Sequence, residues 1–265
     1  MGYRTDLALE RAETKSAKET VNGLQVSRME ENGIHYITVE APQITGTADG
    51  DGKLRSLLSQ ELAALLPKEG EVLVAGLGNP QVTPDALGPL CADRVLATRH
   101  VRGHIGAEAG LSGLRSVSVV KPGVLGTTGI ETAELLHTLI KGLHPAALVA
   151  VDALAAGRLY RLGKTVQLSD GGISPGSGIG NDRPSLCEKT LGVPVIGVGV
   201  PTVVDAATLC SDLCAQSVPG AAQMMVTPRG IDSLVARAAH LLSLAVNCAL
   251  NPALEPETYE QLTGA

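Results

Sequence analysis

Two aspartates stand where apolar segments of the sequence end, and their side chains could do acid–base chemistry. Asp85 lies in GLGNPQVTPDALGP (76–89), which follows the apolar run EVLVA, and Asp152 directly follows the run AALVAV (146–151). A charge among apolar neighbours is costly unless it has a partner. Two carboxylates at adjacent strand ends can share a proton, so that one activates water as a base and the other polarises a carbonyl as an acid.

Both aspartates also have structural interpretations. Aspartate is a good helix N-cap, so Asp152 could cap a helix that begins in ALAA, and Asp85 could begin the turn or helix before ALGPL. A glycine-rich turn after a strand also suggests nucleotide binding, but GLGNPQ lacks the GxGxxG spacing and no Walker lysine follows. The spacing alone leaves capping and catalysis open for both residues.

Apolar strands alternate with amphipathic helices along the chain, which predicts an α/β fold with a mainly parallel sheet and helices on both faces. Residues 1–30 are polar and mixed in charge, and we expect an exposed segment or a peripheral helix there. Residues 45–52 are a turn-rich break. The expected strands are 34–40, 71–77, 115–123, 146–154, 165–170 and 193–201, and the expected helices are 53–66, 87–98, 129–143, 203–216 and 230–250.

In open α/β sheets the functional residues collect beyond the carboxyl ends of the strands. This rule selects polar residues that could bind substrate or shape the loops around it. For Thr127, the alternative is that it caps the helix expected to begin near Gly129. The glycine-rich stretch 171–180 is expected to be mobile and to border the substrate groove, although it could be an ordinary surface loop. These further candidates are Asn79, Thr127, Asp170, Ser177, Asn181 and Thr202.

Composition excludes several classes of protein. The net charge is −6 and only 2% of the residues are aromatic, which argues against a nucleic-acid partner. The N-terminus has no apolar signal region, and no segment is expected to span a membrane. The five cysteines sit in apolar segments and are expected to be buried thiols in a reducing cytoplasm. We expect no metal site and no cofactor.

Several of these segments, in order from about residue 4 to about residue 235, resemble the germination protease (spore endopeptidase) family. The resemblance departs from the family's usual SDTGIHPGSGVGN at Gly171, which replaces a threonine, and at Ser174, which replaces a histidine. The matching segments are RTDLALE, GLGNPQVTPDALGP, ATRH, PGVLGTTGIET, VDALAA, QLSDGGISPGSGIGN, LGVPVIGVGVPTVVDA and VTPRGID.

The resemblance implies an endopeptidase that begins the degradation of small acid-soluble spore proteins during germination. It places the family's two catalytic aspartates on Asp85 and Asp152, and it implies a homotetramer in the cytoplasm of the forespore and spore core. The implied fold is similar to that of hydrogenase-maturation endopeptidases. Two alternatives stay open: a metal-dependent maturation-type endopeptidase on the same fold, and a catalytically silent binding homologue.

The resemblance also implies a self-processing zymogen. The family's cleavage sites have an acidic residue, then an apolar residue, then alanine, and Asp6, Leu7 and Ala8 fit this order. Residues 1–6 are therefore a candidate propeptide. Residues 7–265 form a single endopeptidase domain whose N-terminal part, to about residue 52, is expected to be peripheral. A merely frayed terminus is the alternative.

Overall fold

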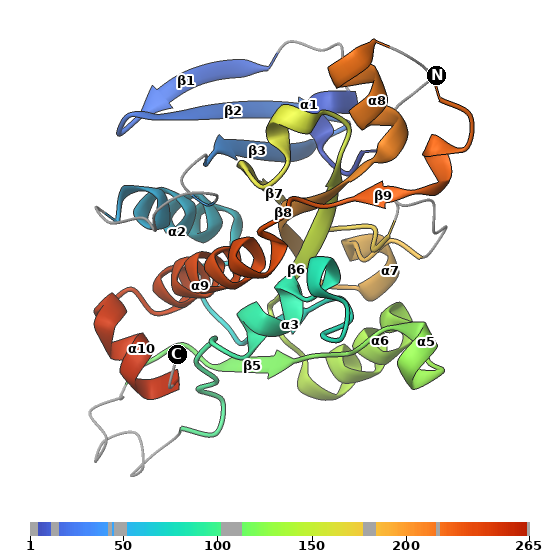
Figure 1. Ribbon diagram of the computed structural model, residues 1–265. Helices are drawn as coiled ribbons and strands as arrows, with labels where there is room; N and C mark the ends of the chain where they lie inside the picture. Colours follow the sequence, from blue (N-terminus) through green and yellow to red (C-terminus); the bar gives the residue numbers. More distant parts are fainter. Residues whose placement is uncertain are drawn as a thin grey trace.

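The central feature of the fold is one twisted sheet with helices packed on its two faces (Figure 1). The computed structural model describes residues 5–11, 16–41, 44, 52–101, 113–176, 184–215 and 218–263. In these residues the sheet has nine strands, in the order β1-β2-β3-β7-β8-β6-β4-β5, with β9 paired to β8. The α/β class predicted from the sequence is confirmed.

Helices and strands alternate along most of the chain, as the apolar patterns predict. In chain order the elements are α1 Ala8–Arg11, β1 Ala17–Val21, β2 Leu24–Glu31, β3 Ile34–Glu40, α2 Lys53–Leu65, β4 Val72–Gly76, the 3₁₀ turn η2 Thr83–Asp85, α3 Leu87–Ala92, β5 Val117–Val120, α5 Leu125–Thr128, α6 Thr132–Leu143, β6 Ala147–Ala156, η3 Leu159–Arg161, β7 Thr165–Ser169, α7 Glu188–Leu191, β8 Val195–Asp205, α8 Ala206–Cys214, η5 Ala221–Gln223, β9 Met225–Val226, α9 Ile231–Leu250 and α10 Pro256–Thr263.

The central strands are apolar on both sides because both of their faces are covered. Val72 and Val74 of β4 face the larger core, which α2, α3 and α9 cover. Leu73 and Ala75 of the same strand face the smaller core under α6 and α7. The continuous apolar runs that marked these strands in the sequence therefore correspond to strands buried on both faces.

The sheet is mixed rather than mainly parallel, which corrects the predicted strand directions. Parallel pairing is confined to the block β5-β4-β6-β8, whereas β1, β2, β3 and β7 pair antiparallel, as do β7 with β8 and β8 with β9. An apolar run shows that a strand is buried but does not fix its direction. The expected helix over 87–98 is also shorter, since α3 ends at Ala92.

Residues 17–30, expected to be an exposed segment or a peripheral helix, form β1 and most of β2; β1 is exposed as expected, whereas β2 carries the buried residues Val26, Ser27 and Met29. Each of the two hairpins, β1–β2 and β2–β3, turns on an Asn-Gly pair. Asn22 and Asn32 have φ values of 53° and 54°, and the glycine after each is also at positive φ. Asn-Gly between apolar runs is a strong hairpin signal, so the sequence did contain the information.

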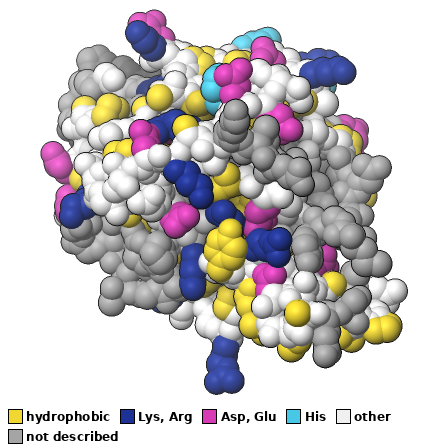
Figure 2. All heavy atoms as spheres, turned by 90° about the horizontal axis from the view of Figure 1, so that it is seen from above, with side chains coloured by type: hydrophobic (Ala, Val, Ile, Leu, Met, Phe, Trp, Pro, Cys, Tyr) yellow, Lys and Arg dark blue, Asp and Glu magenta, His cyan; other side chains and the backbone are white. Residues whose placement is uncertain are grey.

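Helix α9 is long and apolar because it is the main core helix. It is the one described helix long and apolar enough to cross a membrane by length and composition, and 72% of its most apolar window is buried inside the structure. Leu234, Ala238 and Leu242 on this helix pack in the larger core. On the face seen in Figure 2, basic and acidic side chains are interspersed rather than gathered by sign.

The α3–β4 contact depends on two glycines, and it leads to the first prediction. A Cβ at Gly88 would lie 2.2 Å from the carbonyl oxygen of Leu77 and 2.4 Å from that of Val151, and one at Gly76 would lie 2.2 Å from the oxygen of Gly88. We expect Gly88→Ala to lower the free energy of unfolding by roughly 2–3 kcal/mol through overpacking. Urea unfolding measures the change.

Gly142 provides the matched control, since it lies in α6 with nothing within 4 Å of its would-be Cβ. Gly142→Ala should raise the free energy of unfolding by about 0.5–1 kcal/mol, because alanine loses less backbone entropy in a helix. Equal stability of the two variants would contradict the close packing inferred at Gly88.

Candidate active site

Asp85 is held by the loop that follows β4. Gly78 turns this loop at a φ of 113°, and a Cβ there would lie only 2.0 Å from the carbonyl oxygen of Asp85. The loop thus folds back on itself in a way that only glycine permits. The backbone N–H of Asn79 donates to Oδ2 of Asp85 at 2.7 Å. Asn79, a candidate from the sequence for binding substrate or shaping its loop, therefore contacts the acid through its backbone.

Asp152 lies within strand β6 and does not cap a helix. The strand continues to Ala156, so the N-cap alternative is excluded. The side chain is buried, with the residue 5% exposed, and its Oδ1 accepts the N–H of Ala153 at 2.9 Å. Gly199 of β8 lies beside it, where a Cβ would be 2.7 Å from the carbonyl oxygen of Asp152.

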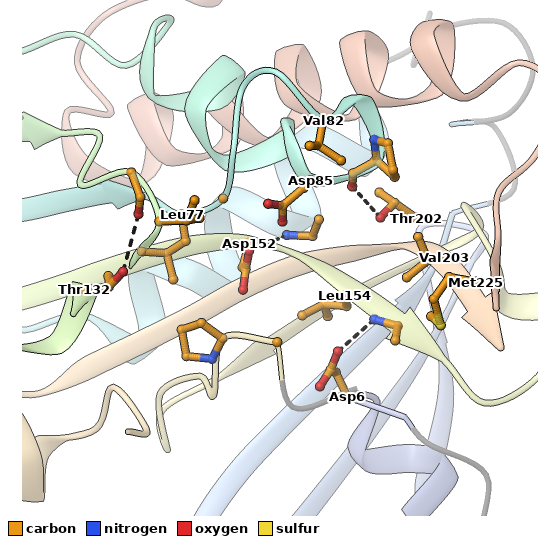
Figure 3. A pocket seen from close by; sticks show the side chains of 18 residues that line it. Asp6, Leu77, Val82, Asp85, Thr132, Asp152, Leu154, Thr202, Val203 and Met225 are labelled. Carbon is orange, nitrogen blue, oxygen red and sulfur yellow. Dashed lines mark hydrogen bonds between the residues drawn. The ribbon is translucent and has the colours of Figure 1, made fainter. Parts of the chain in front are cut away.

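Both aspartates line one cavity of about 270 Å³ at the end of the parallel block. Figure 3 shows the two carboxylates entering it from two elements, Asp85 from the turn after β4 and Asp152 from the adjacent β6. Both acids that the sequence singled out therefore lie at one cavity. A pair of carboxylates in a partly enclosed cavity can divide the roles of base and acid.

Thr202 links strand β8, which lines the cavity, to the turn that carries Asp85. It is fully buried in β8, and its hydroxyl donates to the carbonyl oxygen of Pro84 at 2.7 Å (Figure 3). The register between β6 and β8 shifts between Leu154 and Ala155, next to this residue. Thr202 was predicted from its place just after the expected strand 193–201, whereas it lies inside β8, where its hydroxyl contacts the turn that bears Asp85.

The N-terminal segment reaches the same cavity through Asp6 (Figure 3). The backbone N–H of Asp6 donates to the carbonyl oxygen of Ala155 at 3.0 Å, and its Oδ2 accepts the N–H of Ala155 at 2.8 Å. The side-chain amide of Gln167 on β7 bonds to the backbone on either side of Leu7. It accepts from the N–H of Ala8 and donates to the carbonyl oxygen of Asp6. Leu7 is fully buried. Asp6 therefore lines the cavity that holds the two acids, while Leu7 packs beneath the surface against Leu154 and Ala156.

A buried ion pair anchors this segment, and sequence reasoning missed it. Glu10 and Arg161 have side chains only 7% and 8% exposed, with Oε1 and Nε 3.5 Å apart. Oε2 of Glu10 also accepts the N–H of Gly157 at 2.6 Å and the hydroxyl of Thr5. Burial raises the pKa of Glu10, against the opposing effect of these hydrogen bonds and of Arg161. No local motif marks a pair so distant in sequence.

Two of the remaining candidates, Asp170 and Thr127, are not among the residues that line the cavity. Asp170 ends β7, which runs antiparallel to β8, and its carboxylate instead accepts from the backbone N–H of His35 and contacts its ring nitrogen, both at 2.7 Å. The side chain of His35 is exposed, and its hydrogen bond to Asp170 raises its pKa. Thr127 bonds to Val124 within the short helix α5 and does not cap the helix expected to begin near Gly129, since that helix, α6, begins at Thr132.

The glycine-rich stretch is described only in part. Pro175 and Gly176 line the cavity with Asp152, which agrees with the predicted position of the loop at the groove. Ser177 and Asn181 lie outside the described residues. In the described part of the chain there is no group of three or more histidine, cysteine, aspartate or glutamate side chains placed to hold a metal ion.

The fold and the site together place two acids in a cavity at the end of the parallel strands. This arrangement suits a hydrolase. The sequence model of the family described as germination protease matches residues 8–218. The germination protease of Caldanaerobacter subterraneus subsp. tengcongensis is 37% identical and aligns over 99% of this chain and 98% of its own. That of Clostridium tetani is 35% identical over 97% and 98%. The chain belongs to the germination protease family, and the predicted family resemblance is confirmed.

Among solved structures, a [NiFe] hydrogenase maturation protease, HycI, from Thermococcus kodakarensis aligns over 70% of this chain and 98% of its own. The TM-score is 0.40 and the identity is 18%.

The hydrogen bond from Thr202 leads to the second prediction. Thr202→Val removes the donor to Pro84 while keeping the shape of the side chain, and it should let the turn bearing Asp85 move. We expect kcat for peptide cleavage to fall about tenfold with KM little changed, since about 1.4 kcal/mol of positioning is lost. Steady-state kinetics measure both constants.

Thr208 in α8 is the matched control, because it is equally buried and its hydroxyl makes no hydrogen bond within the described structure. Thr208→Val should keep the kinetics of the unmodified chain. A Thr202→Val variant with unchanged kcat would show that the turn holds Asp85 without this bond.

Proposed function

We propose that this chain is an endopeptidase that uses Asp85 and Asp152 as a pair to activate water. The observation that carries the proposal is the presence of both acids in one cavity of a chain that belongs to the germination protease family. One carboxylate, ionised, takes a proton from water as the water attacks the scissile carbonyl. The other, protonated, donates a hydrogen bond to the carbonyl oxygen and stabilises the charge that develops there.

The backbone contacts support this division of labour. Oδ2 of Asp85 accepts from Asn79, and Oδ1 of Asp152 accepts from Ala153, so each carboxylate has one oxygen fixed by a backbone N–H. A carboxylate held in one orientation needs less reorganisation when it acts on the reacting atoms.

The proposed substrates are small acid-soluble spore proteins, whose degradation the enzyme would begin when a spore germinates. The proposal places the enzyme in the cytoplasm of the forespore and spore core as a homotetramer, with no nucleic-acid or membrane partner and no cofactor. Membership of the germination protease family supports the substrate class. Incubation of the purified chain with one such spore protein, followed by mass spectrometry of the fragments, tests it.

The third prediction concerns the two acids. Asp85→Asn and Asp152→Asn should each lower kcat by about 10²–10⁴ or more, because each removes one half of the acid–base chemistry. The double variant should be little worse than either single one, since the two act as a unit. Cleavage of the spore protein, with folding checked by circular dichroism, gives the answer.

Asp93→Asn is the control, because Asp93 is a surface acid whose side chain is 49% exposed and pairs with Lys121. It should cleave like the unmodified chain. Near-normal turnover by Asp85→Asn would refute the pair, and cleavage abolished by a chelator would favour the metal-dependent alternative.

The fourth prediction is self-processing between Asp6 and Leu7. The position of Asp6 in the cavity supports this bond as the cleavage site, which would release residues 1–6. An acidic residue before the cut is repelled by an ionised pair, so mild acidification should protonate carboxylates and speed processing. N-terminal sequencing after incubation at mildly acidic and neutral pH should find Leu7 sooner at the lower pH.

The Asp152→Asn variant should keep its original N-terminus at both pH values. If the unmodified chain also kept Met1 or Gly2 under both conditions while cleaving spore proteins, the zymogen proposal would be wrong and the proposal of an endopeptidase would stand.

A further inference from the structure

Strand β6 runs past the end of its neighbour β4. The register of the pair ends with Gly76 opposite Val151, and the N–H of Leu77 donates to the oxygen of Val151 as the last bond between them. From there to Ala156, β6 stays paired with β8 on its other side. Because alternate residues of a strand direct their backbone groups to the same side, Ala153, Ala155 and Gly157 present theirs where β4 no longer runs.

Three carboxylates accept the N–H groups along this edge. Asp152 accepts from Ala153 at 2.9 Å, Asp6 from Ala155 at 2.8 Å and Glu10 from Gly157 at 2.6 Å. The backbone N–H of Asp6 also donates to the oxygen of Ala155 at 3.0 Å. One residue of the N-terminal segment thus bonds to both backbone groups of Ala155, with its main-chain N–H as donor and its carboxylate as acceptor.

Asp6 also separates two cavities. The first, of about 270 Å³, holds Asp85 and Asp152. The second, of about 200 Å³, is lined by Gln167, by the start of the glycine-rich stretch at 171–174 and by Leu154, and Asp6 and Leu154 border both. Asp6 thus stands, with Leu154, between the cavity of the paired acids and the cavity beside Gln167.

We infer that the edge of β6 from Ala153 to Gly157 is the binding site for the backbone of the peptide substrate, which pairs with it as an added strand in place of Asp6. The inference rests on the proposed function and names its mode of recognition. A strand edge that no neighbouring strand covers is a template for another extended chain, which can displace the side chains that bond to it. The substrate segment must then be extended when it binds, and main-chain bonds should recognise every second residue of it.

The test measures binding without cleavage. The probe is a fluorescein-labelled peptide Thr-Asp-Leu-Ala-Leu-Glu, the sequence of residues 5–10, added to the full chain carrying Asp85→Asn. Adding Asp6→Ala and Glu10→Gln should loosen the chain's own segment and tighten peptide binding by about tenfold or more, the effect of one or two hydrogen bonds. Fluorescence anisotropy gives the affinities, and thermal unfolding shows that the variants are folded.

Glu71→Gln on the same Asp85→Asn background is the matched control. Glu71 is likewise a poorly exposed carboxylate in an ion pair, here with Arg99, and it lies just before β4. Its substitution should leave the affinity for the peptide unchanged.

A set of peptides, each N-methylated at one residue, identifies the binding mode. Methylation removes one backbone donor, so residues that face β6 should lose about tenfold in affinity and their neighbours should not, with a period of two. The same peptides, used as inhibitors of the unmodified chain, give this result even if the loosened variant does not fold. Uniform losses, or none, would overturn the inference. An alternating pattern in a chain that cleaves nothing would uphold it while the proposed function failed.

Discussion

Strand β6 keeps its pairing with β8 as far as Ala156, although its other neighbour, β4, ends opposite Val151. Backbone N–H groups on the uncovered side still need acceptors, because a buried unpaired donor costs about as much as a lost hydrogen bond. Here the acceptors are carboxylates, among them Asp152 itself, which accepts from the next residue in the chain. The acid is therefore oriented by the strand that carries it.

The end of β4 determines where the other acid lies. The chain leaves β4 at Gly76 and turns back through Gly78. Asp85 therefore lies near β6, the strand that continues beyond the end of β4. Helix α3 packs closely against the start of this loop because Gly88 has no side chain. The hydroxyl of Thr202 on β8 holds the loop through its hydrogen bond to Pro84. The acids come together because β6 continues beyond the end of β4, and no single sequence motif accounts for it.

The sequence predicted the features that depend on local pattern. The buried strands and α9 were found because they are continuous apolar or amphipathic runs, and both acids were found because they end such runs. Strand direction was not predictable in this way, and for that reason Asp170 was assigned to the wrong end of the sheet. The anchoring of the N-terminus by Glu10 and Arg161 also escaped, because its partners are far apart in sequence and each looks like an ordinary surface charge.

The mixed directions of the sheet explain how one face serves both the acids and the N-terminal segment. Asp152 on β6 lies opposite Gly199 on β8, which in turn lies opposite Gln167 on β7. Register partners point to the same face, so Asp152 and Gln167 flank a position without a side chain. The parallel block supplies the acid, and the antiparallel strand supplies the amide that holds Asp6 and Ala8. A side chain at position 199 would meet Leu154 at 2.6 Å, in the floor that the two cavities share. Glycine at this crossing therefore makes room for the side chain of Leu154, which borders the cavity of the paired acids and the cavity beside Gln167.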